Sequence, residues 1–178
     1  DLPNDCGMGF VTGATMGGFT ALASARQKIY KNLGYDLRKS GLKNAPDIRI
    51  IASEDIHTTN IAALNYMGVG RDEIEYAPVD GEGRIIVDEM PILDERCIVM
   101  IQAGNINSGA FDDFKAICAA AKKVGAWVHV DGAFGGWIKV SKNRRHMADG
   151  MELADSWSID CHKWLNVPYD SAIAICRD

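Results

Sequence analysis

The sequence contains no long apolar run and no run of basic residues. No segment reaches the roughly 18 consecutive apolar residues that a membrane-spanning helix needs, and the first residues do not form a basic and then apolar signal peptide. The 19 basic and 24 acidic residues give a formal charge of -5. Neither nucleic acid nor a membrane is therefore an expected partner, because both attract basic patches.

Cysteine is scarce, and its spacing matches neither a disulfide framework nor a zinc site. The chain has five cysteines, an odd number, with no Cys-x-x-Cys pair among them. They are Cys6, Cys97, Cys118, Cys161 and Cys176. We therefore expect reduced thiols, no metal site and a cytoplasmic location.

Repeats, low-complexity tracts and an interdomain linker are also absent. The 178 residues, 47% hydrophobic and 24% charged, are enough for one sizeable domain with its own core. The chain starts without Met, on "DLPNDCGMGF", and stops on an apolar run, "AIAICRD". We expect it to be a piece of a longer protein.

What the sequence does contain is an alternation of short apolar runs and helical patterns. β-branched and apolar runs predict strands over 8–13, 47–53, 73–79, 97–104, 126–136, 155–160 and 171–178. Three- and four-residue spacing of apolar residues predicts helices over 18–33, 58–67, 88–94 and 111–125. Gly125 is placed to cap the end of the last of these helices.

This alternation predicts an α/β fold. Strands separated by helices form a mainly parallel sheet with helices on both faces, a three-layer sandwich. The last two strands are an exception, because "CHKWLNVPY" between them is too short for a crossover helix and contains Pro168. We expect the final strand to be antiparallel, which makes a mixed, seven-stranded sheet.

Polar residues follow several of the predicted strands. "TGATMGG" at 12–18 opens a helix, and its free N–H groups suit a phosphate, although a tight turn with Thr15 as a helix cap explains it equally well. It matches neither the P-loop pattern nor G-x-G-x-x-G. His57 follows the next strand, near a helix start, where it is either a site residue or a capping or solvated histidine.

The later strands end in a similar way. "GNINSGAFDD" carries Asn105, Asn107 and Ser108, which are either site residues, simple loop residues or caps of the next helix. Asp131 ends an apolar strand, where a carboxylate needs a cationic or N–H partner. Lys163 follows "SWSID". A lone lysine is usually a solvated cation, but these residues share one edge of the predicted sheet, because ligands bind at the carboxyl ends of parallel strands.

Together these residues suit one type of cofactor. A cofactor that has a phosphate, a protonated ring nitrogen and a Schiff-base carbon needs a phosphate cradle, a carboxylate and a lysine. "HVDGAFGGW" at 129–137 and "DSWSIDCHKWLNVPYD" at 155–170 resemble the group II pyridoxal-phosphate-dependent amino acid decarboxylases, the family of aromatic-L-amino-acid decarboxylase. "GFVTGATMGGFTALASAR" and "GNINSGAFDDF" resemble it too, in the same order.

The resemblance implies roles for individual residues. Lys163 would carry pyridoxal 5'-phosphate as a Schiff base, with His162 against the phosphate. Asp131 would pair with the ring nitrogen, and Ala133 and His57 would lie on opposite faces of the ring. The remaining cofactor contacts would come from Ala14 and Thr15 at the phosphate turn and from Asn105.

At two positions the sequence departs from the family. Gly17 and Gly18 stand where the family often has Ala-Asn, which suggests a looser helix start. Asp160 stands where some members have a phosphate-binding Asn or Ser, and its charge would repel a phosphate, so its role is open.

The resemblance also implies a function and an architecture. Residues 1–178 would be the cofactor-binding large domain of a fold type I enzyme, without its N-terminal segment and C-terminal small domain. The expected reaction is decarboxylation of an L-amino acid to an amine and CO2 in a homodimer whose active site lies at the subunit interface. The lysine context is nearer the aromatic branch than the glutamate branch. The alternatives are another fold type I enzyme, such as an aminotransferase or aldehyde-forming relative, and a catalytically silent dimerisation module.

Overall fold

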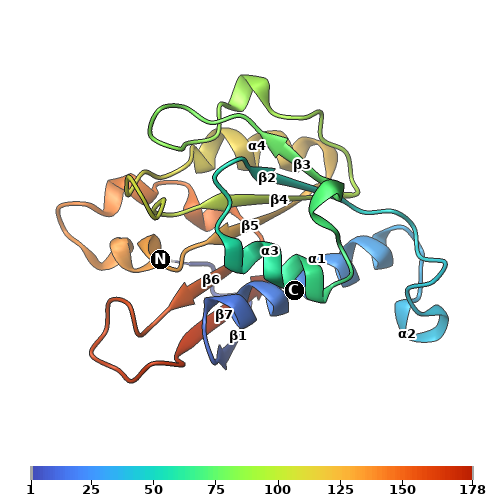
Figure 1. Cartoon of the computed structure of the whole chain (residues 1–178), viewed down its shortest axis with the longest axis horizontal. Coiled ribbons are helices and arrows are strands. Elements are labelled where there is room, and N and C mark those ends of the chain that lie inside the picture. Colours follow the sequence, from blue (N-terminus) through green and yellow to red (C-terminus); the bar gives the residue numbers. More distant parts are fainter. Residues whose placement is uncertain (1, 178) are drawn as a thin grey trace.

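A mixed seven-stranded sheet forms the centre of the molecule (Figure 1). The computed structural model describes residues 2–177. The strands are β1 (Cys6–Val11), β2 (Arg49–Ser53), β3 (Ile74–Ala77), β4 (Cys97–Gln102), β5 (Trp127–Asp131), β6 (Ser156–Asp160) and β7 (Ala172–Arg177), in the spatial order β1-β7-β6-β5-β4-β2-β3. All seven predicted strands are present, and residue 178 of the last one lies outside the described residues.

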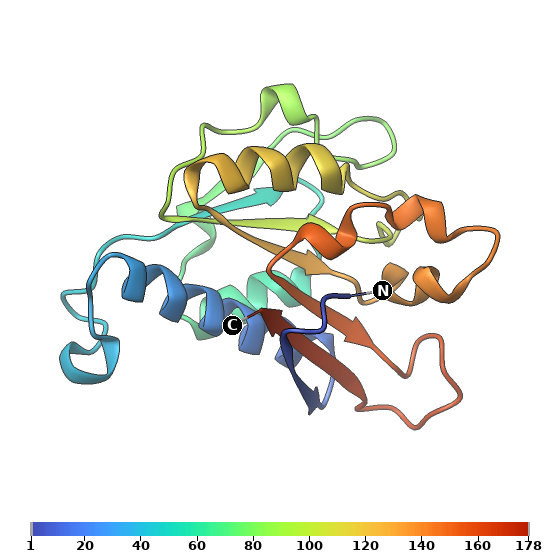
Figure 2. The ribbon, with the colours of Figure 1, turned by 180° about the vertical axis from the view of Figure 1, so that it is seen from behind.

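Helices cover both faces of the sheet, as the three-layer prediction requires (Figures 1 and 2). Helix α4 lies on one face, and helices α1 and α3 lie on the other. The helices are α1 (Ala14–Asn32), α2 (Leu37–Ser40), α3 (Thr58–Tyr66) and α4 (Phe114–Val124). Within residues 2–177, no helix is both long and apolar enough to cross a membrane.

The strand directions confirm the mixed sheet. Strands β3, β2, β4, β5 and β6 pair in parallel. Strand β7 runs antiparallel to β6 and to β1, as the short connection after β6 predicts. The carboxyl ends of the parallel strands therefore share one edge, at which the loops after β4, β5 and β6 also gather.

Several predicted boundaries were wrong. Helix α1 begins at Ala14 rather than at 18, and α4 begins at Phe114 because Asp113 caps it, not Asn107 or Ser108. The segment 88–94 forms only a 3-10 turn, Val87–Glu89, and α2 was not predicted. Strand β5 ends at Asp131 instead of 136, since the chain turns into a 3-10 helix, Gly135–Val140. Gly125 caps α4 as predicted, with φ 77°.

Two apolar clusters hold the layers together. One lies between α4 and the sheet, where Trp157 and Phe114 are its largest fully buried members. The other joins α1 and α3 to the opposite face through Leu22 and Leu64. The central strand β4 is buried along its whole length, which explains its unbroken apolar sequence.

The start of helix α1 packs tightly against its neighbours at Gly17 and Gly18. A Cβ at Gly17 would be 3.1 Å from Ser158 Cβ, and one at Gly18 would be 3.2 Å from Asn60 Oδ1. Both glycines are buried inside the helix. The expectation of a looser helix start was therefore wrong: the two glycines allow the start of α1 to pack against β6 and α3.

The buried carboxyl of Asp112 gives a prediction about stability. It accepts the N–H groups of Ile85 and Gln102 at 2.8 and 2.6 Å, yet burial raises its pKa from 3.8 to about 6. Between about pH 4 and pH 6 the Asp112 carboxyl is therefore protonated in the folded chain but ionised in the unfolded chain. As pH rises through this range, the free energy of unfolding falls by about 3 kcal/mol. Denaturant titrations across this range should show that the free energy of unfolding falls more steeply with pH in the wild type than in Asp112→Asn. Equal pH dependence in the two proteins would contradict a raised pKa for Asp112.

Candidate active site

A small cavity opens at the carboxyl ends of the parallel strands. Its volume of about 20 Å³ has room for about one water molecule. It is lined by His57, Gln102, Gly104, Ile106, Asp131, Ala133, Phe134 and Lys163. The fold thus brings together four residues that the sequence predicts for the site, from the segments after β2, β5 and β6: His57, Asp131, Ala133 and Lys163.

Lys163 is held between a carboxylate and an aromatic ring. Its Nζ lies 3.0 Å from Asp160 Oδ2 and 4.3 Å from the centre of the Phe134 ring. The Lys163 side chain is 27% exposed, whereas that of Asp160 is 3% exposed. Lys163 is therefore not a freely solvated surface cation. Its side chain lines the cavity, and its ammonium group lies beside a buried carboxylate.

Asp131 is fixed by two hydrogen bonds. Asn60 Nδ2 of helix α3 donates to Oδ2 at 2.6 Å, and the backbone N–H of Ala133 donates to Oδ1 at 3.0 Å. Asn60 is itself buried. These donors supply the partners that a carboxylate at the end of an apolar strand requires, and they keep the carboxylate at the cavity wall.

His57 serves two purposes at once. It is the N-cap residue of α3, and its Nδ1 accepts the N–H of Thr59 at 3.2 Å and lies 2.7 Å from Thr59 Oγ1. The same ring lines the cavity. The capping interpretation from the sequence was therefore correct, and it is compatible with a place in the site because the cap fixes the ring at the start of α3.

A buried hydrogen-bond chain lies in the sheet next to Asp131. His129 Nδ1 is 2.9 Å from Ser156 Oγ, which also accepts the indole N–H of Trp127 at 2.9 Å. Burial lowers the pKa of His129 to about 4, against the opposing effect of the Asp131 charge. His129 is therefore neutral at pH 7.

The start of helix α1 offers free N–H groups. Its N-cap residue is Gly13, which has no side chain, so the predicted cap by Thr15 is wrong: Thr15 lies inside the helix. The N–H of Ala14 donates to Asp160 Oδ1 at 2.7 Å. Within residues 2–177, the N–H groups of Thr15 and Met16 make no hydrogen bond. These N–H groups and the helix dipole suit an anion.

The two remaining predicted residues lie differently. His162 Nε2 is 3.8 Å from Asp160 Oδ2, so this histidine lies next to the start of α1. The Asn105 side chain does not line the cavity. Its Oδ1 instead accepts the N–H groups of Asn107 and Ser108, at 2.9 and 3.3 Å, and so stabilises the loop after β4.

Reasoning from the sequence missed Asn60 and left Asp160 without a role. Asn60 lies three residues after His57, on the same side of the first turn of α3, and this spacing is the one signal that could have found it. Asp160 is the last residue of β6, and its backbone carbonyl accepts the indole N–H of Trp137 at 2.6 Å. No local pattern shows that its side chain points toward α1.

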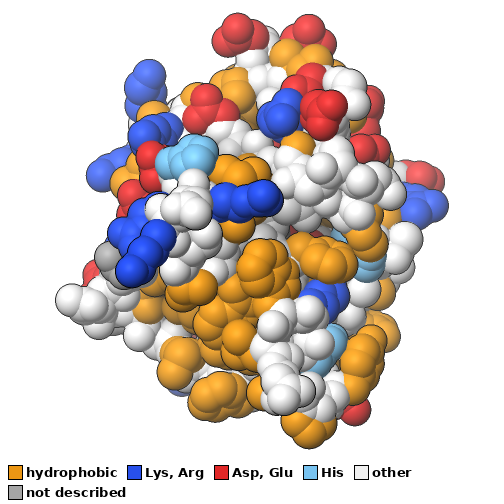
Figure 3. All heavy atoms as spheres, turned by 90° about the vertical axis from the view of Figure 1, so that its left-hand side faces the viewer, with side chains coloured by type: hydrophobic (Ala, Val, Ile, Leu, Met, Phe, Trp, Pro, Cys, Tyr) orange, Lys and Arg blue, Asp and Glu red, His pale blue; other side chains and the backbone are white. Residues whose placement is uncertain are grey.

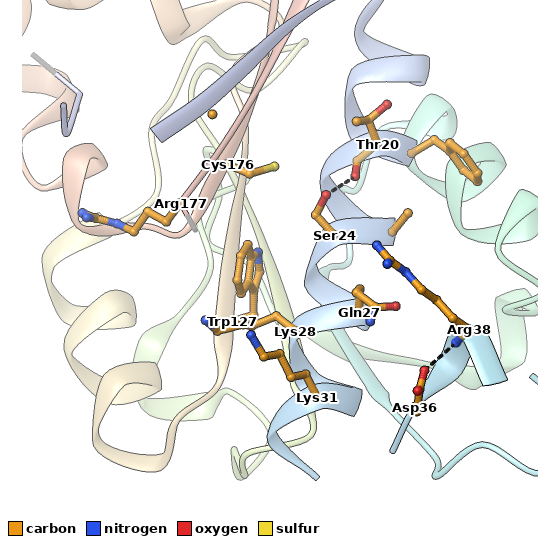
Figure 4. A pocket seen from close by; sticks show the side chains of 13 residues that line it. Thr20, Ser24, Gln27, Lys28, Lys31, Asp36, Arg38, Trp127, Cys176 and Arg177 are labelled. Atoms are coloured by element: carbon orange, nitrogen blue, oxygen red, sulfur yellow. Dashed lines mark hydrogen bonds between the residues drawn. The ribbon is translucent and has the colours of Figure 1, made fainter. Parts of the chain in front are cut away.

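A larger hollow lies elsewhere (Figure 4). This groove of about 1120 Å³ is lined by α1, α2, β7 and Trp127, with the basic residues Lys28, Lys31, Arg38 and Arg177 around it. It is open and includes none of the residues of the cavity at Lys163. We therefore place the candidate active site at the smaller cavity, where residues that the sequence predicts for the site converge: His57, Asp131, Ala133 and Lys163.

Comparison with known families shows to which family the chain belongs. Residues 4–178 match the model of the pyridoxal-dependent decarboxylase conserved domain. The chain belongs to this decarboxylase family. The family confirms the resemblance found in the sequence and pyridoxal phosphate as its cofactor, and its members are lyases.

Individual relatives of the chain are amino acid decarboxylases. Aspartate 1-decarboxylase of Aliivibrio fischeri is 31% identical over 95% of this chain and 34% of its own length. Cysteine sulfinic acid decarboxylase of Mus musculus is 28% identical, over 95% of this chain and 35% of its own. The crystal structure of mouse CSAD in apo form has a TM-score of 0.87 at 27% identity, over 98% of this chain and 38% of that one. The chain thus spans about a third of the length of the curated relatives it matches.

The residues of the site fit pyridoxal phosphate, with one exception. The cofactor presents a phosphate, a ring nitrogen and an aldehyde, and the chain offers free N–H groups at α1, the carboxylate of Asp131 and the amine of Lys163. The cavity of about 20 Å³ is smaller than an aromatic ring, so the side chains that line it would have to move to admit one. The exception is Asp160, a carboxylate at the start of α1, where the phosphate would bind.

The bond between Asn60 and Asp131 can be tested directly. Asn60→Ala removes a buried donor from the carboxylate, and we expect a loss of about 1–3 kcal/mol of stability together with weaker binding of pyridoxal phosphate. Thermal unfolding and cofactor titration measure the two effects. Asn65→Ala, at an exposed position of the same helix, is the control. Equal cofactor affinity in both variants would show that Asn60 has no part in the site.

Proposed function

We propose that this chain is the cofactor-binding part of an amino acid decarboxylase that removes CO2 from an L-amino acid and releases the amine. The observation that carries the proposal is the convergence of Lys163, Asp131 and His57 on one cavity at the carboxyl edge of the sheet. Membership of the decarboxylase family supports it independently. The match covers about a third of each relative, so activity belongs to the whole protein of which these residues form the site.

Lys163 is the proposed attachment point. Its side chain lines the cavity from the short loop after β6, where its amine would bond to the aldehyde of the cofactor and later give way to the amine of a substrate. The contacts with Asp160 and Phe134 define its resting position. The Lys163 side chain has four methylene groups, so it can leave this position without a movement of the backbone.

Asp131 is the proposed partner of the ring nitrogen. When bound, pyridoxal phosphate supplies a pyridinium ring that accepts the electron pair of the bond broken at the substrate α-carbon. A carboxylate at the ring nitrogen holds the proton there, which keeps the ring electron-poor. Asn60 and the Ala133 N–H fix this carboxylate in advance, so it requires little reorganisation during the reaction.

The other predicted residues complete the proposed site. His57 and Ala133 both line the cavity, where they would bound the ring on its two faces. Ala14 and Thr15, with His162 nearby, would hold the phosphate at the start of α1. Asn105 would contribute indirectly, because its Oδ1 stabilises its own loop and its Nδ2 donates to Asp55 Oδ2 at 3.5 Å.

For the substrate class, the comparisons favour an acidic side chain over the aromatic one suggested by the lysine context. Aspartate and cysteine sulfinate are named for two relatives that match 95% of this chain. A structure of Oryza sativa TDC with PLP and tryptamine matches as well, at 25% identity and a TM-score of 0.78. A screen of L-aspartate, L-glutamate, cysteine sulfinate, L-tryptophan and L-tyrosine for CO2 release separates the two classes.

A second copy of the chain is the proposed partner at the site. The face at the carboxyl edge carries a broad group of hydrophobic side chains (Figure 3). Exposed members on the loops around the cavity are Ile106, Phe134, Val140, Met147, Trp164, Leu165, Val167 and Tyr169. Exposed apolar side chains that gather on one face often mark a protein–protein contact. We also propose a cytoplasmic location, in agreement with the five free cysteines.

The central test is Lys163→Ala. Without the amine, we expect no covalent attachment of pyridoxal phosphate, read as loss of the visible absorbance and of the mass increase after borohydride reduction, and no CO2 release. Lys142→Ala, at an exposed position 21 residues earlier, should retain both. Attachment that persists in Lys163→Ala would rule out this lysine.

Product analysis separates the competing functions. Amine plus CO2 supports the decarboxylase, whereas a keto acid indicates an aminotransferase, and an aldehyde with peroxide indicates an aldehyde-forming enzyme. A protein that contains the whole chain but binds no pyridoxal phosphate would support a silent dimerisation module.

The proposed partner can be tested with a charge. Val140, 74% exposed, belongs to the hydrophobic face, and Val140→Asp should shift the protein from dimer to monomer in light scattering, because a buried carboxylate opposes association. Ile92 is 88% exposed and precedes β4, away from that edge. Ile92→Asp is therefore the matched control. A dimer that survives Val140→Asp unchanged would place the interface elsewhere.

A further inference from the structure

The side chain of Asp160 occupies the anion position at the start of α1. Its Oδ1 accepts the N–H of Ala14 at 2.7 Å, and its Oδ2 lies 3.0 Å from Lys163 Nζ. The residue is 2% exposed. Helix α1 has neither a side-chain cap at Gly13 nor an acidic residue in its first turn, so Asp160 supplies from β6 the negative charge that the helix dipole favours.

The same carboxylate contacts two groups that the proposed function needs elsewhere. Ala14 belongs to the turn that would hold the phosphate, and Lys163 is the amine that would react with the aldehyde. A phosphate at Thr15 and Met16 would therefore lie beside a buried carboxylate. Two like charges separated by a few ångströms and shielded from water repel strongly.

We propose that Asp160 is a built-in competitor of the cofactor phosphate and the resting counter-ion of Lys163. This inference rests on the proposed function and names a positioning residue for it. In the absence of phosphate, Asp160 stabilises the start of α1 and neutralises the Lys163 ammonium. A bound phosphate would compete with these two contacts and repel the Asp160 carboxylate. The wild-type chain therefore binds pyridoxal phosphate more weakly than a variant with a neutral residue at position 160.

The geometry also explains why Asp160 is not merely a structural cap. A cap needs only Oδ1, but Oδ2 faces Lys163 and lies 3.8 Å from His162 Nε2, so the carboxylate joins the helix start to both residues of the His-Lys pair. Asp160→Asn keeps an oxygen for the Ala14 N–H and removes the charge. The variant therefore separates the capping contact from the electrostatic effect.

The first experiment uses inorganic phosphate as the probe. After dialysis to remove cofactor, we expect phosphate to raise the unfolding temperature of Asp160→Asn at about tenfold lower concentration than that of the wild type. Asp149→Asn removes one negative charge from a side chain that is 55% exposed and 4.0 Å from Lys115, and it should behave as the wild type does. Equal phosphate affinity in wild type and Asp160→Asn would overturn the proposal.

The second experiment compares two aldehydes. Pyridoxal phosphate and pyridoxal each condense with the Lys163 ammonium to give a protonated imine and one water, but only the former carries a phosphate. Asp160→Asn should bind pyridoxal phosphate about tenfold more tightly and pyridoxal less than twofold more tightly. If both aldehydes gain by the same factor, Asp160 acts on Lys163 alone and the competition with phosphate is refuted.

The two experiments distinguish a failure of this inference from a failure of the proposed function. Failure of both aldehydes to attach to Lys163 in every variant would contradict the function, while the phosphate titration would still measure the competition at α1. If Asp160→Asn does not fold, Asp160→Ser provides the same removal of charge with a hydroxyl that accepts the Ala14 N–H, and the same expected affinities apply to it.

Discussion

The parallel pairing of β4, β5 and β6 is the constraint on which the site depends. In this register Gln102 is aligned with Asp131, and Asp131 with Ser158. Parallel strands end on the same side of a sheet, so the segments that follow them must leave from one edge. Residues far apart in the sequence thus converge on a single cavity, and the strands fix the backbone from which each side chain starts.

Helix α1 adds the second half of the site because it can approach the sheet closely. Gly17 and Gly18 bring its first turn against Ser158 and Asn60, and this places the free N–H groups of the helix beside Asp160 and Lys163. Burial of the apolar face of α1 against the sheet stabilises this close packing. The charged groups at the start of α1 then determine which anion binds there.

The site is a set of charges fixed before any ligand binds. Asp131 has its donors, His129 stays neutral beneath it because burial lowers its pKa, and Lys163 is paired with Asp160. Such preorganised groups reduce the reorganisation needed during catalysis. The same arrangement places Phe134 and Lys163 together in the lining of the cavity, with Lys163 Nζ 4.3 Å from the centre of the Phe134 ring.

The sequence by itself determined the α/β class, the seven strands, the antiparallel turn after β6 and the family, because apolar runs, helical spacing and the motif around Lys163 are local patterns. It also placed His57, Asp131, Ala133 and Lys163 at strand or helix ends, from which a shared edge follows. Only the tertiary structure decided that Asn60 holds Asp131, that Asn105 turns to its own loop and that Asp160 reaches the start of α1. These contacts depend on how far apart two elements pack and on where a side chain points, and neither is encoded in a run of neighbouring residues.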